Sequence, residues 1–196
     1  MTVSISAAKR LNSPRGQSEL ELHPLQAYPP MYTLQPVVQT REKQLEAWRK
    51  LVTEWAENND IWSIDAAKIP LWGNRSINRQ LSEEGIKCVV EHLIEMGNAM
   101  WVEKLPAKTS DSISGRILRI MWRTPSDVAS DLTDFAKKNG MSGGIYTLYE
   151  LQGAFGIKDP WVLREAVNCL EERGLAARME GSKLSEKKDG VKFSEL

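Results

Sequence analysis

The chain has 196 residues, enough for one domain or two small ones. Lys and Arg together number 26, and so do Asp and Glu, so no net charge draws the protein to nucleic acid or to an anionic membrane. The two cysteines, Cys88 and Cys169, lie in separate helical patterns, which predicts buried reduced thiols of a cytosolic protein rather than a disulfide framework. No apolar run approaches membrane-spanning length, and no signal-peptide pattern follows Met1.

The first distinctive segment is residues 28–36, Tyr-Pro-Pro-Met-Tyr-Thr-Leu-Gln-Pro. The adjacent Pro29 and Pro30 fix φ and remove two backbone donors, so these residues cannot join a helix or a central strand. We therefore predict extended, polyproline-II-like geometry, from which Met31 and Tyr32 project. Local composition leaves two interpretations open: a docking peptide for another protein, or a strap that packs its aromatic residues onto its own domain.

A first set of elements follows, each predicted from hydrophobic period and from capping residues. In chain order they are a helix that follows the N-cap Thr40 and ends at 58–59, a short strand over 61–64, a short helix over 74–81, a helix over 83–96 capped by Ser82, and two extended runs over 99–105 and 116–122. Residues 106–115 between the two runs are polar and rich in turn formers, which indicates a hairpin with a mobile tip.

A second set repeats this order. It comprises a helix that starts at Thr124-Pro125 and ends before Gly140, a short strand at 145–146, a brief helix with a Thr147–Glu150 capping box that ends near Phe155-Gly156, a helix that starts at Asp159-Pro160 and ends before Gly174, and a hairpin that pairs 175–179 with 191–193. The capping boxes and the proline in the first turn are typical helix starts.

A shift of 77 residues superposes the two sets. It aligns four apolar positions and a C-terminal glycine: Ile86 with Leu163, Val89 with Ala166, Val90 with Val167, Leu93 with Leu170, and Gly97 with Gly174. A helix, a short strand, two helices and a β-hairpin in about 80 residues form a winged helix, a helix-turn-helix variant with a hairpin wing. The sequence therefore predicts an α+β, mainly helical fold with two tandem winged-helix domains.

The predicted boundaries follow from these elements. Residues 1–27 are expected to be a disordered tail, 28–123 the first winged helix with its proline motif, and 124–196 the second. The join near Arg123-Thr124-Pro125 leaves almost no linker, so we expect the two domains to pack rigidly against each other.

Winged helices often bind DNA, but the charges here disfavour it. Both third helices carry more acidic than basic residues: Glu83, Glu84, Glu91 and Glu95 against Lys87 in one, and Glu165, Glu171 and Glu172 against Arg164 and Arg173 in the other. Such helices would be repelled by phosphates. Lys183, Lys187 and Lys188 form the only local basic cluster, and Glu180, Glu186 and Asp189 offset it.

No catalytic, metal-binding or cofactor-binding pattern is present in the sequence. His23 lies in the predicted tail, and His92 lies on a helix among glutamates, where a surface role is the simplest interpretation. No Cys/His spacing suits a metal, and no phosphate loop or nucleophile motif occurs. We predict that the protein is not an enzyme and has no cofactor.

Two of the seven tryptophans are harder to assign to a core than the others. Trp72 lies in the loop Pro70-Leu71-Trp72-Gly73, and Trp161 lies one residue into its helix. Each is either an intramolecular packing residue, which we favour, or an interface residue.

Several motifs resemble one protein family. Pro29 to Pro36, Thr40-Arg41 and Gln44-Leu45-x-x-Trp48 are similar to the opening of the small ESCRT-II subunits, the vacuolar protein-sorting-associated protein 25 family. Further similar motifs are Ile120-Met121-Trp122-Arg123-x-Pro125, Thr147-Leu148-Tyr149-Glu150-Leu151 and Gly190-Val191-Lys192-Phe193. The resemblance spans about residues 28–194.

The resemblance implies a non-enzymatic scaffold, present in two copies in a Y-shaped cytosolic complex with two larger ESCRT-II subunits. It implies that Pro29, Pro30, Met31 and Tyr32 dock into hydrophobic pockets of those subunits. It further implies that the second winged helix, Thr124 to Leu196, contacts an ESCRT-III subunit in the sorting of ubiquitinated cargo into multivesicular bodies. The protein would then be cytoplasmic and reach the endosomal membrane indirectly, through the complex.

Two departures from the family pattern concern the contacts. Animal members end the docking motif in phenylalanine, whereas Tyr32 adds a hydroxyl that requires water or an acceptor. The acidic insertion that some members carry after residues 147–151 is nearly absent here.

Two other functions compete with this one. Pro-Pro-x-Tyr is also a ligand pattern of WW domains, which would make the protein an adaptor. A DNA-binding winged-helix regulator is the third alternative.

Overall fold

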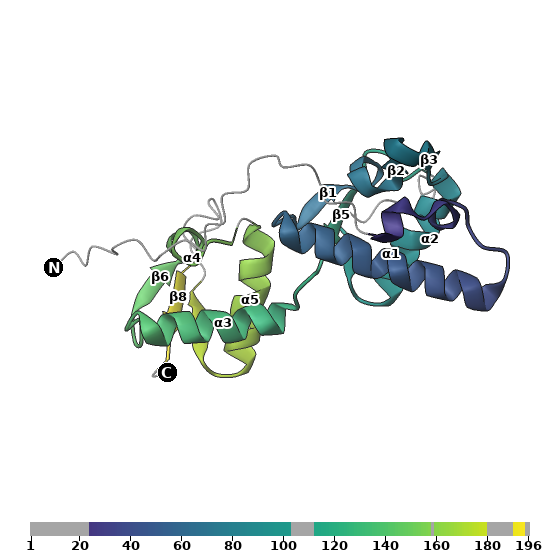
Figure 1. The fold of residues 1–196 in the computed structure, drawn as a ribbon. Helices are drawn as coiled ribbons and strands as arrows, with labels where there is room; N and C mark the ends of the chain where they lie inside the picture. The colour runs from purple at the N-terminus through teal and green to yellow at the C-terminus, as the bar shows by residue number, and fades with distance from the viewer. Residues whose placement is uncertain (1–23, 103–111, 158, 180–189, 195–196) are drawn as a thin grey trace. The chain divides into compact units, whose positions relative to one another are not determined.

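A computed structural model describes residues 24–102, 112–157, 159–179 and 190–194 of the chain (Figure 1). Most of the predicted tail and of the predicted mobile tip, and the lysines at 183, 187 and 188, lie outside these residues. The chain divides into two compact units, with the boundary between Trp122 and Arg123. They are termed the first unit and the second unit.

The first unit combines two α-helices and a three-stranded sheet with a run of short 3-10 turns in its described part. Its elements are η1 (Pro24–Ala27), η2 (Pro29–Tyr32), α1 (Val38–Asn58), β1 (Ser63–Asp65), η3 (Ala66–Lys68), η4 (Pro70–Trp72), β2 (Gly73–Asn74), η5 (Arg75–Ile77), β3 (Arg79–Gln80), α2 (Glu83–Glu95), β4 (Ala99–Trp101) and β5 (Ile117–Ile120). Helix α1 packs against α2, and the apolar residues between them form one core.

The second unit has three helices and one three-stranded sheet among its described residues. Its elements are α3 (Pro125–Lys138), β6 (Ile145–Thr147), α4 (Leu148–Phe155), α5 (Pro160–Glu172), β7 (Ala176–Met179) and β8 (Gly190–Phe193). The predicted capping boxes are present. The Thr124 hydroxyl accepts the Asp127 N–H at 3.1 Å, and the Thr147 hydroxyl accepts the Glu150 N–H at the same distance. Local side-chain chemistry therefore sets both helix starts.

The two three-stranded sheets have the same strand order, β1-β5-β4 in the first unit and β6-β8-β7 in the second, and all their pairs are antiparallel. Strands β2 and β3 form a separate two-stranded antiparallel sheet in the first unit. In each sheet the strand between α-helices pairs with the last strand of the wing. Leu118 lies opposite Ile64 and Trp101, and Val191 lies opposite Tyr146 and Arg178. Both predicted wing hairpins are confirmed, and the fold is mixed α and β, mainly helical, with the winged-helix arrangement.

The aligned positions of the repeat are equivalent in the structure. All eight apolar residues are buried, and Leu93 and Leu170 are both fully inaccessible. Gly97 and Gly174 each end their helix region at positive φ, 73° and 70°, which is why glycine stands at both places. The sequence repeat thus corresponds to a structural one.

The last residues of the predicted tail, Pro24–Ala27, form the 3-10 turn η1, with Gln26 only 6% exposed. Two predicted helices of the first unit also differ from the structure. Helix α1 begins at Val38 rather than after Thr40, with Val37 as an N-cap that makes no side-chain bond. The predicted helix over 74–81 is replaced by η5 between β2 and β3. The Asn74 side chain accepts the Ser76 N–H, and Asn78 adopts φ 51°, so the chain reverses there instead of continuing as a helix.

The cysteines also differ from expectation. Cys88 and Cys169 are free thiols, but both are half-buried rather than fully buried. Burial raises the pKa of the Cys88 thiol, and the carboxylates of Glu91 and Glu84 raise it further, since a thiolate there would meet like charge. Burial and the two neighbouring carboxylates thus disfavour the thiolate form of Cys88.

Candidate partner-docking site

The proline motif forms a single turn of 3-10 helix, η2. The Met31 N–H donates to the Tyr28 carbonyl at 3.0 Å, and the Thr33 N–H donates to the Pro30 carbonyl at 3.3 Å. The predicted polyproline-II extension is therefore wrong. Prolines at the first positions of a helical turn already have a suitable φ, and their missing N–H groups would have no partner in that turn anyway.

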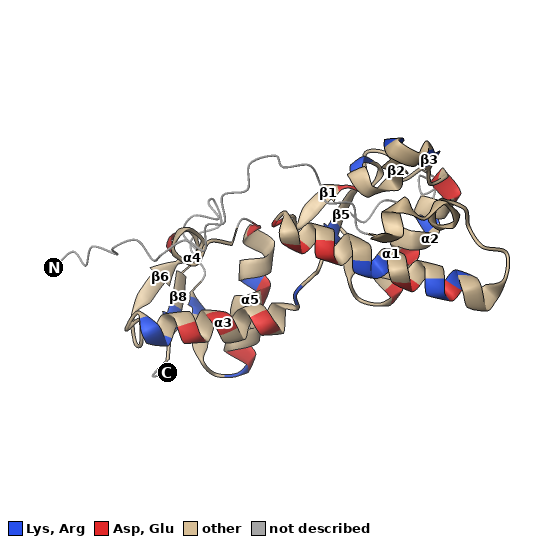
Figure 2. Ribbon diagram, viewed as in Figure 1, with Lys and Arg blue, Asp and Glu red and all other residues tan. Residues whose placement is uncertain are grey.

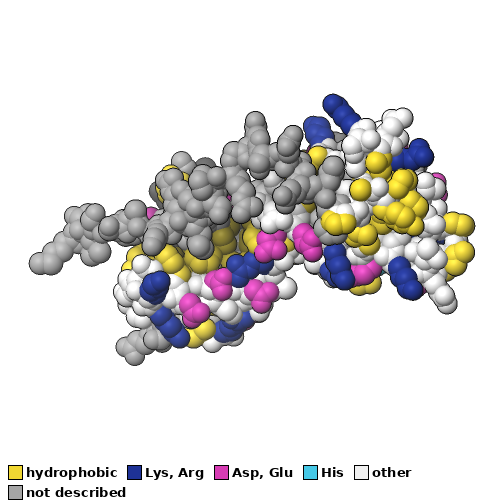
Figure 3. All heavy atoms as spheres, in the orientation of Figure 1, with side chains coloured by type: hydrophobic (Ala, Val, Ile, Leu, Met, Phe, Trp, Pro, Cys, Tyr) yellow, Lys and Arg dark blue, Asp and Glu magenta, His cyan; other side chains and the backbone are white. Residues whose placement is uncertain are grey.

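The turn has two faces with opposite exposure. Met31 and Tyr32 are only 5% and 4% exposed and belong to the core of the first unit. Pro29 and Pro30 are exposed, and Tyr28 before them is 58% exposed. Figure 3, in the orientation of Figure 1, shows hydrophobic atoms at the surface where η1 and η2 lie. The motif is thus anchored by its second half and presents its first half to solvent.

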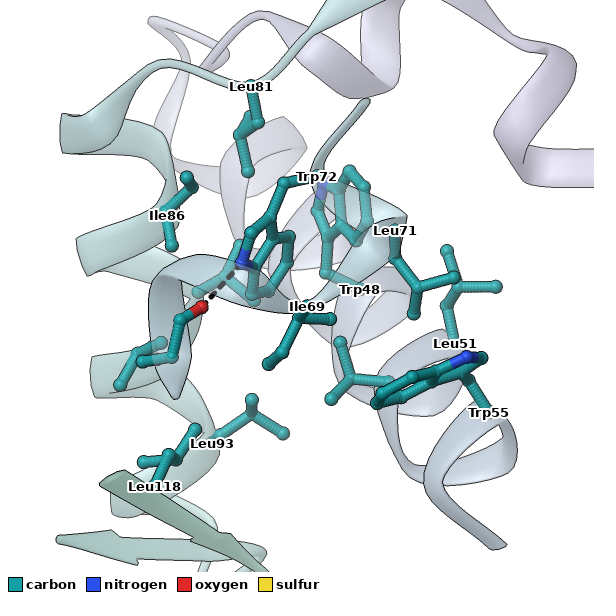
Figure 4. Packing of buried hydrophobic residues seen from close by; sticks show 14 of the residues in the cluster. Trp48, Leu51, Trp55, Ile69, Leu71, Trp72, Leu81, Ile86, Leu93 and Leu118 are labelled. Carbon is teal, nitrogen blue, oxygen red and sulfur yellow. Dashed lines mark hydrogen bonds between the residues drawn. The ribbon is translucent and has the colours of Figure 1, made fainter. Parts of the chain in front are cut away.

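The Tyr32 ring is held by tryptophans of the core. It packs edge-on against Trp48 at 5.7 Å between ring centroids, and Trp48 packs against Trp72 at 5.5 Å. Figure 4 shows Trp48 and Trp72 side by side, with Leu71 and Ile69 close by. These aromatic contacts add to the stabilisation from buried apolar surface and fix the orientation of the motif on the domain.

The Tyr32 hydroxyl has an acceptor within its own domain. It donates to the Gln26 carbonyl at 3.3 Å, and the Asn74 amide donates to the same carbonyl at 2.8 Å. Burial raises the pKa of Tyr32, and a hydrogen bond with the Asn74 side chain partly offsets that rise. The hydroxyl that departs from the family pattern is therefore satisfied without a partner protein.

Two side chains of α1 bind the backbone of the motif. The Gln44 amide nitrogen lies 3.2, 3.0 and 2.9 Å from the carbonyl oxygens of Pro30, Met31 and Thr33, which its two N–H groups share. The Trp48 indole N–H donates to the Met31 carbonyl at 3.0 Å. We use the term strap for residues 24–36. The strap is held to α1 by backbone carbonyls as well as by its buried side chains.

The sequence indicated Trp48 as a core residue, named Gln44 only as part of a motif similar to the family, and gave Asn74 no role in this site. A signal for Gln44 did exist, because it lies one helical turn before Trp48 and so on the same buried face. Gln44 is 7% exposed and Asn74 5% exposed, and a buried polar side chain is informative because it requires partners.

Comparison with known proteins places this chain in a family. The family model described as "ESCRT-II complex subunit" matches residues 25–158, well over half of the chain and including most of the strap. The chain belongs to this family. The resemblance noted from the sequence motifs is thereby confirmed.

Curated relatives of this ESCRT-II family member carry the name vacuolar protein-sorting-associated protein 25. The one from Danio rerio is 34% identical over 160 residues, covering 76% of this chain and 86% of the relative. The one from Arabidopsis thaliana is 30% identical over 175 residues, covering 85% and 92%. The one from Xenopus laevis is 37% identical over 127 residues, covering 63% and 68%.

Solved structures share the fold of this ESCRT-II family member. A crystal structure of subunit VPS25 of the endosomal trafficking complex ESCRT-II gives a TM-score of 0.73 at 22% identity, covering 87% of this chain and 98% of that one. A chain of the crystal structure of endosomal complex ESCRT-II (VPS22/VPS25/VPS36) gives 0.69 at 21% identity, covering 88% and 98%. The predicted fold class is confirmed by these likenesses.

The geometry of the strap disfavours a WW-domain ligand in this ESCRT-II family member. WW domains bind extended polyproline-II segments and grip an accessible tyrosine. Here the motif is a 3-10 turn, and the Tyr32 side chain is part of the domain core. A WW domain would have to pull Tyr32 away from Trp48 before it could bind.

The charge distribution does not favour nucleic acid either. Figure 2 shows basic and acidic residues interspersed along α1, α3 and α5. In α2 the four glutamates are exposed, and Lys87 lies 3.9 Å from the Glu83 carboxylate. A recognition helix with these charges would meet phosphates with repulsion.

The structure also bears on the two unassigned tryptophans, on metal binding and on membrane-spanning helices. Trp72 is 3% exposed and donates its indole N–H to the Ala66 carbonyl at 2.7 Å, so it is a core residue, whereas Trp161 is half-buried. Among the described residues, no cluster of His, Cys, Asp and Glu is arranged to hold a metal ion. None of the described helices is both long and apolar enough to cross a membrane.

Proposed function

We propose that this chain is a non-enzymatic scaffold subunit of ESCRT-II that joins the larger subunits through its strap. The observation that carries the proposal is the exposed Pro29–Pro30 edge, held on a folded domain in a member of the ESCRT-II subunit family. A similar chain is part of a solved complex described as VPS22/VPS25/VPS36. VPS22 and VPS36 are therefore the proposed partners. Within the predicted motif, Pro29 and Pro30 make the contact, while Met31 and Tyr32 hold the turn in place.

Exposed prolines suit such a contact for a physical reason. Pro29 and Pro30 are rigid, so little conformational entropy is lost when a partner covers them. Their rings and the ring of Tyr28 give an apolar surface without charge, which fits a hydrophobic pocket on another domain.

We expect the Pro29→Ser/Pro30→Ser double variant to lose co-purification with VPS22 and VPS36. Because both residues are exposed, the free energy of unfolding should fall only by about 1–2 kcal/mol, chiefly because the unfolded chain gains freedom. The matched control is Pro24→Ser, an exposed proline of the same strap outside the motif, which should co-purify normally. Unchanged assembly of the double variant would defeat the docking role.

The second unit is proposed to recruit an ESCRT-III subunit, and so to link the complex to cargo sorting at the endosomal membrane. Its sheet carries two exposed apolar residues that support this role. Ile145 on β6 is 61% and Met179 on β7 48% exposed; on the central strand β8, Ile145 lies opposite the exposed Lys192 and Met179 opposite Gly190. Exposed apolar residues that lie together are typical of protein–protein contacts.

A charge at this face is expected to weaken the ESCRT-III contact. Ile145→Asp places a carboxylate where an apolar partner surface would exclude water, which we expect to weaken binding at least tenfold. The measurement is a pull-down against a panel of purified ESCRT-III subunits, with Glu172→Ala on the exposed end of α5 as the control. If Ile145→Asp captures the same subunit as the parent chain, the contact lies elsewhere in the second unit.

A further inference from the structure

The strap could bind a partner in two ways, and its bonds to its own domain would have opposite effects on the affinity in the two cases. It could detach from its domain and dock as an extended peptide, or it could dock in the conformation that it has in the free chain. Detachment would expose two large side chains, Met31 and Tyr32, and break the hydrogen bonds that Gln44 and Trp48 donate to the strap carbonyls. That loss would be subtracted from the affinity.

We propose that the strap stays folded on its domain when a partner binds, and that Gln44 is the positioning residue that keeps it there. This inference rests on the proposed docking function. Gln44 is 7% exposed on the buried face of α1, beneath the strap, and so acts on binding only through the strap.

Gln44 is suited to this role because it binds the strap on both sides of the turn. Its N–H groups reach the carbonyls of Pro30 and Met31 within the turn and of Thr33 after it, and its own carbonyl accepts the Gln35 N–H at 3.1 Å. The Gln35 side chain stabilises the turn from within the strap, since its amide nitrogen lies 3.1 Å from the Pro30 carbonyl oxygen and 2.8 Å from the Thr33 carbonyl oxygen.

Within the turn itself, residues 29–32, the described polar bonds to α1 come from the Gln44 amide and the Trp48 indole. Arg41 of α1 holds the strap only after the turn, where its guanidinium donates to the carbonyls of Gln35 and Pro36. The exposed edge therefore depends chiefly on Gln44 and Trp48 for its polar attachment. Pro29 and Pro30 point outward only while the 3-10 turn persists. If loss of Gln44 leaves the turn formed one tenth of the time, the apparent Kd for the partner rises about tenfold. An apolar residue of similar size preserves the packing while removing the donors.

The test is the Kd of the full chain for a purified complex of VPS22 and VPS36, measured by calorimetry. We expect Gln44→Met to raise the Kd about tenfold. The matched control is Leu118→Val, a fully buried residue of β5 outside the strap, which should lower the thermal midpoint without changing the Kd. An unchanged or lower Kd for Gln44→Met overturns the inference, because a strap that had to detach would bind more tightly once its bonds were removed.

Two further variants separate a positioning role from a general loss of stability. Gln44→Glu keeps an acceptor for the Gln35 N–H but turns a second oxygen towards the strap carbonyls in place of the donors, so it should raise the Kd at least as much as Gln44→Met. In a double-mutant cycle with Pro30→Ala, the effect of Gln44→Met should shrink, since both changes act through one surface. Fully additive effects would contradict action through the strap.

Failure of this inference can be told apart from failure of the docking function. If the Pro29→Ser/Pro30→Ser variant assembles normally, the docking function itself is wrong. If that variant loses assembly while Gln44→Met binds like the parent chain, the docking function stands and only the positioning role of Gln44 is refuted.

Discussion

The Trp48→Ala variant is expected to lower the free energy of unfolding of the first unit by about 3–5 kcal/mol. Trp48 is 1% exposed, so its removal leaves a large cavity between α1 and the strap. The same change removes the ring against which Tyr32 packs and the N–H that the Met31 carbonyl accepts. Since a domain of this size is stable by about 5–15 kcal/mol, much of the first unit's stability would be lost.

Tryptophan fluorescence reports this loss mainly from the first unit. Six of the seven tryptophans lie there: Trp48, Trp55, Trp62, Trp72, Trp101 and Trp122. In Trp48→Ala, the midpoint of urea denaturation followed by fluorescence should therefore move to a lower urea concentration. Binding to VPS22 and VPS36 should be lost as well. Trp48→Phe is the control, because it keeps an aromatic ring but not the N–H and should cost less. A midpoint unchanged in Trp48→Ala would show that the strap and α1 do not share a core.

The second unit could be predicted well because its signals are local. The Thr124 and Thr147 capping boxes are each closed between residues three apart, and the Asp159 carboxylate accepts the Trp161 N–H two residues later. Interactions of this kind are written in a few adjacent residues and do not depend on the rest of the fold.

The first unit departs from prediction where distant residues decide the conformation. Asn74, at the start of the predicted helix over 74–81, donates to the Gln26 carbonyl, 48 residues earlier in the chain. That bond and the left-handed Asn78 fix a turn where the local pattern favoured a helix. The spacing of hydrophobic residues along the sequence cannot predict such a contact, because it does not show which distant segments pack together.

The sequence drew attention to the proposed docking segment but did not predict its conformation. Two prolines before an aromatic residue marked residues 29–32, and the alternatives of strap and docking peptide were both open. The structure combines them: Tyr32 packs as a strap residue, while Pro29 and Pro30 remain exposed as a docking surface would require. Which side chains of the motif point into the domain is decided by residues of α1. Trp48 and Gln44 both donate to the Met31 carbonyl, and neither is near the motif in sequence.

The paired variants Leu93→Ala and Leu170→Ala are expected to act selectively on the first and second unit. Each leucine is 0% exposed at equivalent positions of α2 and α5, so each substitution should cost about 2–5 kcal/mol in its own unit. Far-UV circular dichroism reports both units, while tryptophan fluorescence reports mainly the first. Leu93→Ala should lower the midpoint of the fluorescence transition. Leu170→Ala should lower the midpoint of the second unit's part of the dichroism transition and leave the fluorescence midpoint unchanged.

Selectivity is expected because Leu93 and Leu170 belong to different compact units, and distant substitutions are additive within about 0.5 kcal/mol. The same measurement examines the short join at Arg123-Thr124-Pro125. If the two units pack rigidly through it, Leu170→Ala will also lower the stability of the first unit by the lost interface energy, and the fluorescence midpoint will move with it. A fluorescence midpoint that moves as far as the dichroism midpoint would show a single cooperative body and contradict two separate cores. Val162→Ala, also buried in α5, provides the control, since it should follow Leu170→Ala in direction with a smaller shift.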